Sequence, residues 1–257
     1  KEGIKKAKEI GADGFQVYVT KGEMYPDNIS REQRAEFRRF VAEMGLEISA
    51  LCGDFNWVKG FLDAEHNKVN TPRVKKCIDL AVDLGVRVVT MHIGHLPADE
   101  NAAAYQEALR TSIELARYAE ERGCVLATET GPESPADLLK FLKKVSSKGI
   151  GVNYDPANLV MCGPFDQIGG VGTLREYIAH THAKDGVCLG GGKYVEVPLG
   201  QGGVVFPYWI AALDKIGYDG FLTVEREVGG DPVKDIAEAV RFLRSFETRE
   251  LPQIPWS

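Results

Sequence analysis

The stretch TPRVKKCIDLAVDLGVRVVTMHIG, residues 71 to 94, contains the alternation that decides the fold. Its first part spaces apolar residues at helical intervals, opens on Thr71 with Pro72 in the first turn, and ends at Gly85. Its second part, residues 86 to 94, is a short apolar run rich in β-branched residues, which is typical of a buried strand. Helices and strands that alternate in this way predict a parallel sheet, because parallel neighbours need a crossover between them.

The same alternation runs along the whole chain. Seven runs have the composition of strands: residues 14 to 19, 46 to 52, 86 to 94, 124 to 130, 149 to 155, 177 to 185 and 220 to 227. Helices are predicted over residues 1 to 11, 30 to 45, 71 to 85, 102 to 123, 135 to 147, 206 to 216 and 232 to 246. Five helices end in a glycine that precedes a strand and is expected in the left-handed conformation: Gly11, Gly45, Gly85, Gly123 and Gly217.

Repeated strand and helix units over 257 residues predict a (β/α)8 barrel, also called a TIM barrel. No Gly/Ser-rich linker or charge run marks a boundary, so residues 1 to 257 are interpreted as a single domain with a short extended tail, LPQIPWS, at the C-terminus. Seven strands do not close such a barrel, and an open barrel would leave unpaired backbone edges. We therefore expect the first strand of the barrel to precede Lys1.

Composition narrows the function classes. Hydrophobic residues make up 44% and charged residues 26% of the chain, which is typical of a folded globular protein. A net charge of −6 without a Lys/Arg cluster argues against a nucleic-acid partner, and no run of 18 apolar residues indicates a membrane segment. The five cysteines are scattered and form no CxxC pair, which favours a reducing compartment and a cytoplasmic location.

Four residues of metal-ligand type lie at the ends of four neighbouring predicted strands: Glu129, Asp155, His182 and Glu225. In a TIM barrel the carboxyl ends of the strands converge on one mouth, where three carboxylates would repel one another unless a cation neutralised them. Carboxylate oxygens with one imidazole favour Mn²⁺, with Mg²⁺ or Co²⁺ as alternatives. Zinc is less favoured, because the set holds no thiolate and is not rich in histidine.

Several motifs together resemble one family. The segments LATETG (126 to 131), VNYDPANL (152 to 159), HTHAKD (180 to 185), VPLGQGG (197 to 203) and FPYWIAALDKIGYDGFLTVERE (206 to 227) are similar to the sugar phosphate isomerase/epimerase superfamily, the xylose isomerase-like or AP endonuclease family 2 barrels. The resemblance runs nearly end to end and is most specific in the C-terminal half. It implies the same four metal ligands, with Glu129 and Glu225 also acting as the acid/base pair that moves a proton beside a metal-bound carbonyl, through an enediolate.

Four further residues are predicted to bind substrate. In the superfamily a histidine at the place of His92 lines the substrate pocket, the alternative being a buried, hydrogen-bonded structural histidine. Lys184 and Glu227 lie two residues beyond His182 and Glu225, so each shares a face of its strand with a ligand. Lys184 contacts either the substrate or a carboxylate at the rim.

The fourth, Asn158, stands where ketose 3-epimerases of the superfamily carry a histidine, and Cys188 lies near the place of their substrate-binding arginine. The predicted function is a divalent-metal-dependent sugar or polyol isomerase or epimerase. Two alternatives stay open: a metal-dependent dehydratase or lyase for a keto-inositol or 3-keto-glycoside, and a non-catalytic sugar-binding or regulatory barrel. An AP endonuclease is disfavoured by the acidic balance and the five histidines. The expected partner is a small-molecule sugar or polyol, and the resemblance implies a homo-oligomer.

Overall fold

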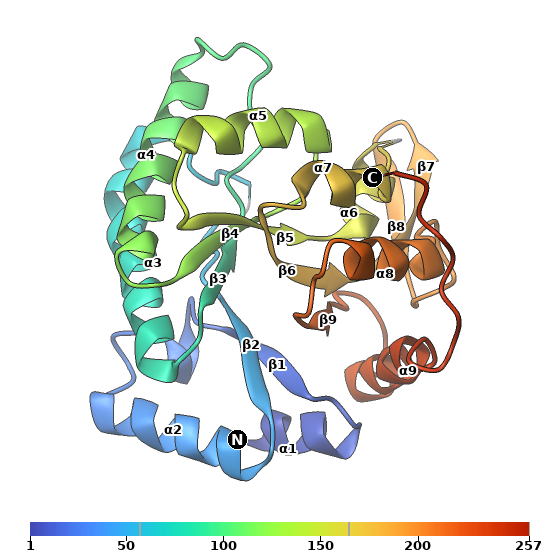
Figure 1. Cartoon of the computed structure of the whole chain (residues 1–257). Helices are drawn as coiled ribbons and strands as arrows, with labels where there is room; N and C mark the ends of the chain where they lie inside the picture. The colour runs from blue at the N-terminus through green and yellow to red at the C-terminus, as the bar shows by residue number, and fades with distance from the viewer. Residues whose placement is uncertain (57, 164, 257) are drawn as a thin grey trace. The chain divides into compact units, whose positions relative to one another are not determined.

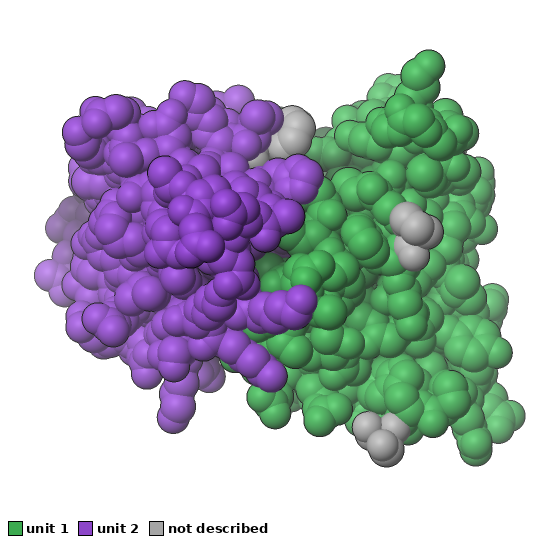
Figure 2. Space-filling model, turned by 90° about the horizontal axis from the view of Figure 1, so that it is seen from above, with its two compact units in different colours: residues 1–12, 130–139, 154–257 green, residues 13–129, 140–153 purple. Residues whose placement is uncertain are grey.

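The computed structural model describes residues 1–56, 58–163 and 165–256. The chain divides into two compact units, which Figure 2 colours separately. Unit 1 comprises residues 1–12, 130–139 and 154–257, and unit 2 comprises residues 13–129 and 140–153. The single-domain interpretation stays a prediction.

Unit 2 contains parallel strands that alternate with helices (Figure 1). Its strands are β1 (Gly14–Tyr18), β2 (Glu47–Cys52), β3 (Val88–Met91), β4 (Val125–Glu129) and most of β5 (Ile150–Tyr154). Its helices are η1 (Gly22–Met24), α2 (Arg31–Glu43), α3 (Ala64–Leu84), α4 (Ala103–Glu120) and the C-terminal half of α5 (Pro135–Val145). Each strand pairs with the next one along the chain, which places Cys52 opposite Thr90 and Glu129 opposite Asn153.

The core of unit 2 forms around apolar side chains of β2, β3, β4 and α3, as expected for a parallel sheet covered by helices. Side chains from three of its strands and from helix α3 have no exposed surface: Leu51, Val89, Leu126, Ile78 and Leu80. Burial of each such side chain contributes about 1.5 to 3 kcal/mol. The packed interior therefore holds the strand ends, and the polar residues that follow them, in a fixed register.

Unit 1 contains the C-terminal elements of the chain. Its helices are α1 (Glu2–Glu9), α6 (Pro156–Cys162), α7 (Gly169–Leu174), α8 (Phe206–Lys215) and α9 (Pro232–Arg244). Strands β6 (Ile178–Ala183) and β9 (Leu222–Val224) pair in parallel, and β7 (Asp185–Gly190) pairs with β8 (Lys193–Val197) as an antiparallel hairpin. The core includes Trp209 and Phe206, whose rings meet edge to face at 5.7 Å. Phe242 of α9 meets Phe206 in the same way at 5.1 Å.

The predicted helix start at Ser30 and the five predicted glycine ends are confirmed. Helix α2 begins after Ser30, whose hydroxyl accepts from the backbone of Gln33 while the Gln33 side chain accepts from the backbone of Ser30. This reciprocal capping box satisfies two N–H groups that the first turn of a helix leaves unpaired. The five glycines at the helix ends all have positive φ: Gly11 82°, Gly45 68°, Gly85 74°, Gly123 67° and Gly217 74°.

The predicted start of helix α3 at Thr71 is wrong. The helix begins at Ala64, because the carboxylate of Asp63 accepts hydrogen bonds from the backbone N–H groups of Glu65 and His66 at 2.9 and 3.0 Å. Pro72 therefore lies inside the helix rather than in its first turn. Proline removes one backbone bond there, and a helix of 21 residues that buries one face retains enough packing to continue past it.

The β7–β8 hairpin and the short helices α6 and α7 were not predicted. The loop after the hairpin, PLGQGG, is organised by Asp185, a fully buried residue. Its two carboxylate oxygens accept backbone N–H bonds from Gly186, Gly200, Gly202 and Val204 at 2.9 to 3.0 Å. These loop amides are therefore engaged within the protein.

In the part of the chain that the structure describes, the seven parallel strands follow one another in the sheet in chain order, β1-β2-β3-β4-β5-β6-β9. This order, with helices between most of the strands, is that of a TIM barrel, which confirms the predicted fold class. Strands β3 and β9 are shorter than the predicted runs. Among the described residues, no helix combines the length and the apolar character needed to cross a membrane.

Candidate metal centre

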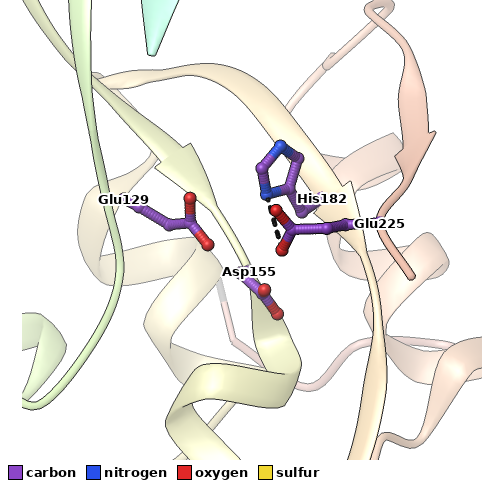
Figure 3. A group of neighbouring side chains, drawn as sticks. All are labelled: Glu129, Asp155, His182 and Glu225. Atoms are coloured by element: carbon purple, nitrogen blue, oxygen red, sulfur yellow. Dashed lines mark ion pairs between the residues drawn. The ribbon is translucent and has the colours of Figure 1, made fainter. Parts of the chain in front are cut away.

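The four predicted ligand residues form one group (Figure 3). Glu129 ends β4, Asp155 follows β5, His182 lies in β6, and Glu225 follows β9. Each residue offers one ligand atom, and these atoms all lie within 4.8 Å of one another. Glu129 is the last residue before the segment 130–139 of unit 1, and the other three belong to unit 1.

Asp155 is fixed by hydrogen bonds on both sides. Its Oδ1 accepts from the backbone of Ala157 at 2.7 Å and of Asn158 at 3.2 Å, so the carboxylate caps helix α6. Its backbone N–H donates to the hydroxyl of Thr130, and that hydroxyl donates to its carbonyl, both at 2.8 Å. A buried carboxylate with this backbone geometry has one orientation.

Glu225 lies beside the imidazole of His182, in β6, and the ammonium group of Lys184, which directly follows β6. Its Oε2 lies 3.3 Å from Nδ1 of His182 and 2.8 Å from Nζ of Lys184. Burial would raise the pKa of Glu225, but His182 and Lys184 together hold that pKa below its ordinary value. Burial would likewise lower the pKa of Lys184, but the charges of Asp155 and Glu225 hold it above its usual range. Glu225 and Lys184 therefore keep each other charged.

His180 shares a strand face with His182 but does not belong to the ligand group. Its ring is buried, meets that of His182 edge to face at 5.7 Å, and its Nε2 lies 3.0 Å from the hydroxyl of Thr223. Burial, with the neighbouring charge of His182, lowers the pKa of His180 to about 3. His180 is therefore a neutral residue of the interior.

Glu129 has its own neighbours in unit 2. Asn153 Nδ2 donates to its Oε2 at 3.2 Å, and Nε2 of His92 lies 3.9 Å from the same oxygen. Nδ1 of His92 in turn lies 2.6 Å from Oδ2 of Asp54. The Glu129 carboxylate at the end of β4 thus lies between the side-chain amide of Asn153 and the imidazole of His92.

Each residue predicted to bind substrate contacts one of the four ligand residues or a residue close to them. Lys184 joins Glu225 to Glu227 at 2.8 Å to each, and the Glu227 side chain is 63% exposed. The side-chain amide of Asn158 donates to the carbonyl of Thr130 at 3.1 Å. His92, 31% exposed at its side chain, is hydrogen-bonded to Asp54 rather than closed into the core. Their contacts with a substrate stay predictions.

Sequence reasoning missed two residues that support the site. Asp54 lies two residues beyond β2, and Thr130 directly follows Glu129. Asp54 was detectable in principle, since a carboxylate just after a strand of the same sheet obeys the rule that selected the four ligands. Thr130 carries no such signal, because its hydroxyl acts only through its bonds to Asp155.

The donor set fits a divalent cation. Three carboxylates and one imidazole within 4.8 Å supply hard oxygen donors and a single borderline nitrogen, which suits Mn²⁺ and Mg²⁺. Without positive charge nearby, carboxylates this close would raise each other's pKa. Lys184 supplies part of that charge on the Glu225 side. A bound cation would balance the remaining negative charge of the three carboxylates.

Parallel strands in chain order, with three carboxylates and one imidazole gathered at the strand ends, place the chain in the class of α/β barrels. Within that class, the chain belongs to the xylose isomerase-like TIM barrel family, whose model matches residues 4–246.

Three individual proteins show how far the likeness extends. The crystal structure of a xylose isomerase domain protein from Planctomyces limnophilus has a TM-score of 0.85 and 27% identity, over 95% of this chain and 91% of that one. A putative L-ribulose-5-phosphate 3-epimerase of Haemophilus influenzae is 24% identical over 84% of this chain and 79% of its own. A xylose isomerase-like TIM barrel protein from Mycobacterium smegmatis, solved in complex with magnesium, has a TM-score of 0.75 and 22% identity, over 95% and 86% of the two chains.

Proposed function

We propose that this protein is a divalent-metal-dependent isomerase or epimerase of sugars or polyols. The observation that carries the proposal is the group of Glu129, Asp155, His182 and Glu225, with one ligand atom from each within 4.8 Å of the others. Family membership supports it, as does the similarity to a protein named as a putative L-ribulose-5-phosphate 3-epimerase. The structural similarity to a barrel solved in complex with magnesium supports the metal requirement.

These four residues would hold one cation, and we propose Mn²⁺ before Mg²⁺ or Co²⁺, because the set mixes oxygen donors with one nitrogen. When bound, such an ion polarises a sugar carbonyl and makes the neighbouring C–H acidic. We assign the proton transfers to Glu129 and Glu225, one removing the proton and the other returning it on the opposite face. Lys184 and His182 support this role for Glu225, because they favour its charged, proton-accepting form.

Metal content tests the first half of the proposal. Purified protein should retain about one equivalent of divalent metal by elemental analysis, and Glu129→Gln and Asp155→Ala should lose most of it, because each removes one of four donors. Glu238→Gln, on the solvent side of α9, is the matched control and should retain the metal. Wild-type protein that binds no divalent cation under any loading condition would sink the proposal.

Proton exchange tests the second half. A panel of ketoses, a keto-inositol and a 3-keto-glycoside would be incubated with metal-loaded enzyme in D₂O. Deuterium appearing beside the carbonyl of a ketose, with a new epimer or aldose, is the expected result. Loss of water from the keto-inositol or cleavage of the glycoside would favour the dehydratase or lyase alternative. Binding without exchange in any compound would favour a sugar-binding barrel.

Two broader expectations accompany this proposal. All five cysteines are free thiols, which supports residence in a reducing, cytoplasmic compartment. The expected partner is the sugar or polyol substrate, and assembly into a homo-oligomer stays a prediction. Light scattering of the purified protein would measure that assembly.

A further inference from the structure

Phosphate groups have a preferred place in α/β barrels, the loops that follow the last two strands. Backbone N–H groups, a helix N-terminus and basic side chains are directed at the anion there. In unit 1 these loops follow β6 and β9, and both start close to a ligand residue, since β6 contains His182 and Glu225 directly follows β9. The groups in these two loops therefore bear on whether the substrate can carry a phosphate.

The backbone amides of the loop after β6 are already bound. The carboxylate of Asp185 accepts N–H bonds at 2.9 to 3.0 Å from four residues, Gly186, Gly200, Gly202 and Val204. The PLGQGG loop wraps this carboxylate so closely that a Cβ added at Gly202 would collide with it. Successive glycine amides of this kind can bind phosphate. Here a fully buried residue of the chain itself takes the place of the anion.

The arginine of the loop after β9 lies between two carboxylates. Nη1 of Arg226 lies 2.6 Å from Oε1 of Glu196, in β8, and its Nε lies 3.8 Å from Oδ2 of Asp235, in α9. The Arg226 and Glu196 side chains are only 13% and 5% exposed, so salt screens their attraction little. Arginine is the side chain best suited to bind phosphate, and this one is already neutralised by the protein.

The helix N-terminus that follows β9 also faces carboxylates. Oδ1 of Asp231 accepts from the backbone N–H of Lys234 at 3.1 Å and caps α9. Asp235 lies in the first turn of the same helix, and its Oδ2 is so close to Gly229 that a Cβ added there would collide with it. The positive end of the helix dipole, which attracts phosphate in other proteins, is thus occupied by two negative charges.

The other basic side chains of the two loops do not reverse this balance. Lys184 lies 2.8 Å from Glu225 and 2.8 Å from Glu227, so two carboxylates share its charge. Lys193 is exposed on β8, where an ammonium group is strongly hydrated and screened. Residues 184–205 and 225–231 together contain five acidic residues and three basic ones, which leaves them net negative.

We propose that the site takes a neutral, unphosphorylated sugar or polyol and discriminates against its phosphate esters. The chain's own carboxylates already bind the amides, the arginine and the helix N-terminus on which a phosphate would depend, and like charges would repel the ester. The inference rests on the proposed function and narrows its substrate class. Asp185 and Glu196 occupy the donors, while Asp231 and Asp235 supply the repulsion.

Matched pairs of sugars test the discrimination. D-fructose would be compared with D-fructose 6-phosphate, and L-ribulose with L-ribulose 5-phosphate, by deuterium exchange at carbon 3 in excess Mg²⁺. We expect kcat/KM to favour each free sugar by roughly 10-fold or more. Titration calorimetry of the Mg²⁺-loaded protein would measure the same preference as a ratio of Kd values, without turnover. Inorganic phosphate, titrated alone, would account for any direct binding to the metal.

Two variants test which carboxylates repel the ester. Asp231→Ser keeps a good helix cap but removes its charge, and Asp235→Asn removes the second charge with little change of shape. Each should lower the preference for the free sugar several-fold, mainly by lowering the KM and Kd of the ester. Asp214→Asn, exposed on α8, is the matched control and should keep the wild-type ratio. Thermal melts would show that each variant is folded.

The outcomes separate this inference from the function on which it rests. A phosphate ester that reacts or binds as well as its free sugar in wild type would overturn the inference and leave the isomerase proposal standing. An unchanged ratio in both variants would refute the role of Asp231 and Asp235. Absence of exchange in every sugar would count against the proposed function, and the Kd ratios would still decide the inference. Failure of every sugar and ester to bind would refute both.

Discussion

Replacing Asp185 with asparagine should loosen the loop that follows the β7–β8 hairpin. The buried carboxylate accepts four backbone N–H bonds, from Gly186 and Val204 at Oδ1 and from Gly200 and Gly202 at Oδ2. Asparagine keeps one acceptor oxygen, and its NH₂ group would face two donors. The substitution preserves size and shape, so its effect measures the lost acceptor and not a cavity.

The magnitude follows from the number of bonds lost. Two backbone donors without an acceptor in a partly buried setting cost about 1 to 2 kcal/mol each, or about 2 to 4 kcal/mol together. For a chain of this size, 1 kcal/mol shifts Tm by about 2 to 4 °C, so a loss near the middle of the range corresponds to about 9 °C. Thermal and urea unfolding, followed by circular dichroism, would measure both quantities.

Hydrogen exchange locates the effect. Amide exchange across residues 200 to 204 should accelerate in Asp185→Asn, while exchange in helix α4 should change little. Asp214→Asn, exposed on α8, is the matched control and should match wild type in Tm and in exchange. An unchanged Tm together with unchanged exchange of the loop amides would refute the reasoning that Asp185 organises this loop.

Three further changes test the fold and its electrostatics. Ser30→Ala should lower the free energy of unfolding by about 1 kcal/mol in urea titration, because it breaks the capping box of α2. Arg110 and Asn67 hold the pKa of Glu107 at about 2, against its ordinary value of 4.5. The Glu107 carboxylate therefore stabilises the fold above pH 4.5, and this stabilisation is lost as pH falls from 4.5 toward 2. Glu107→Gln should remove this part of the dependence of the unfolding free energy on pH. Solvent screening at Arg110 keeps this to about 1 to 2 kcal/mol, measurable from urea midpoints at pH 6 and pH 3. Gly149→Ala should destabilise by at least about 2 kcal/mol in the same titration, because its Cβ would collide with the backbone of α4.

Each of these changes has its own control. Thr248→Ala, which removes an exposed hydroxyl in the turn after α9, should not reproduce the effect of Ser30→Ala on stability. A Glu114→Gln variant, paired to the same arginine through a longer bond, should retain most of the acid-side slope. Gly3→Ala, where a Cβ meets open space, should be neutral or slightly stabilising. Equal destabilisation at Gly3 and Gly149 would contradict the collision argument.

Much of the candidate site was predictable because it depends on strand order and parity. Glu129, Asp155, His182 and Glu225 each lie at or just beyond the carboxyl end of an apolar run, and parallel strands carry those ends to the same edge. The glycines at the helix ends were predictable for a similar reason, since a left-handed residue has few alternatives to glycine. Both signals are local and repeat along the chain.

The remainder depends on contacts between distant residues. Asp54 and His92 are 38 residues apart, and their bond exists only once two strands have paired. The start of α3 was misplaced because Thr71 and Pro72 have the composition of a helix start, while Asp63 makes the cap bonds. The β7–β8 hairpin was within reach, since three glycines between two alternating runs are a turn signal.

The bonds that hold Asp155 have a thermodynamic consequence for any cation that the group binds. Its Oδ1 is already engaged with Ala157 and Asn158, and its backbone with Thr130, so the side chain gives up its rotational freedom when the chain folds. Immobilising such a side chain during binding would cost about 0.5 to 1.5 kcal/mol. At Asp155 that entropy is already lost when the chain folds, so ion binding does not have to repay it. Because the cap bonds to α6 do not depend on the ion, the side chain would keep its orientation when one ion dissociates and another replaces it.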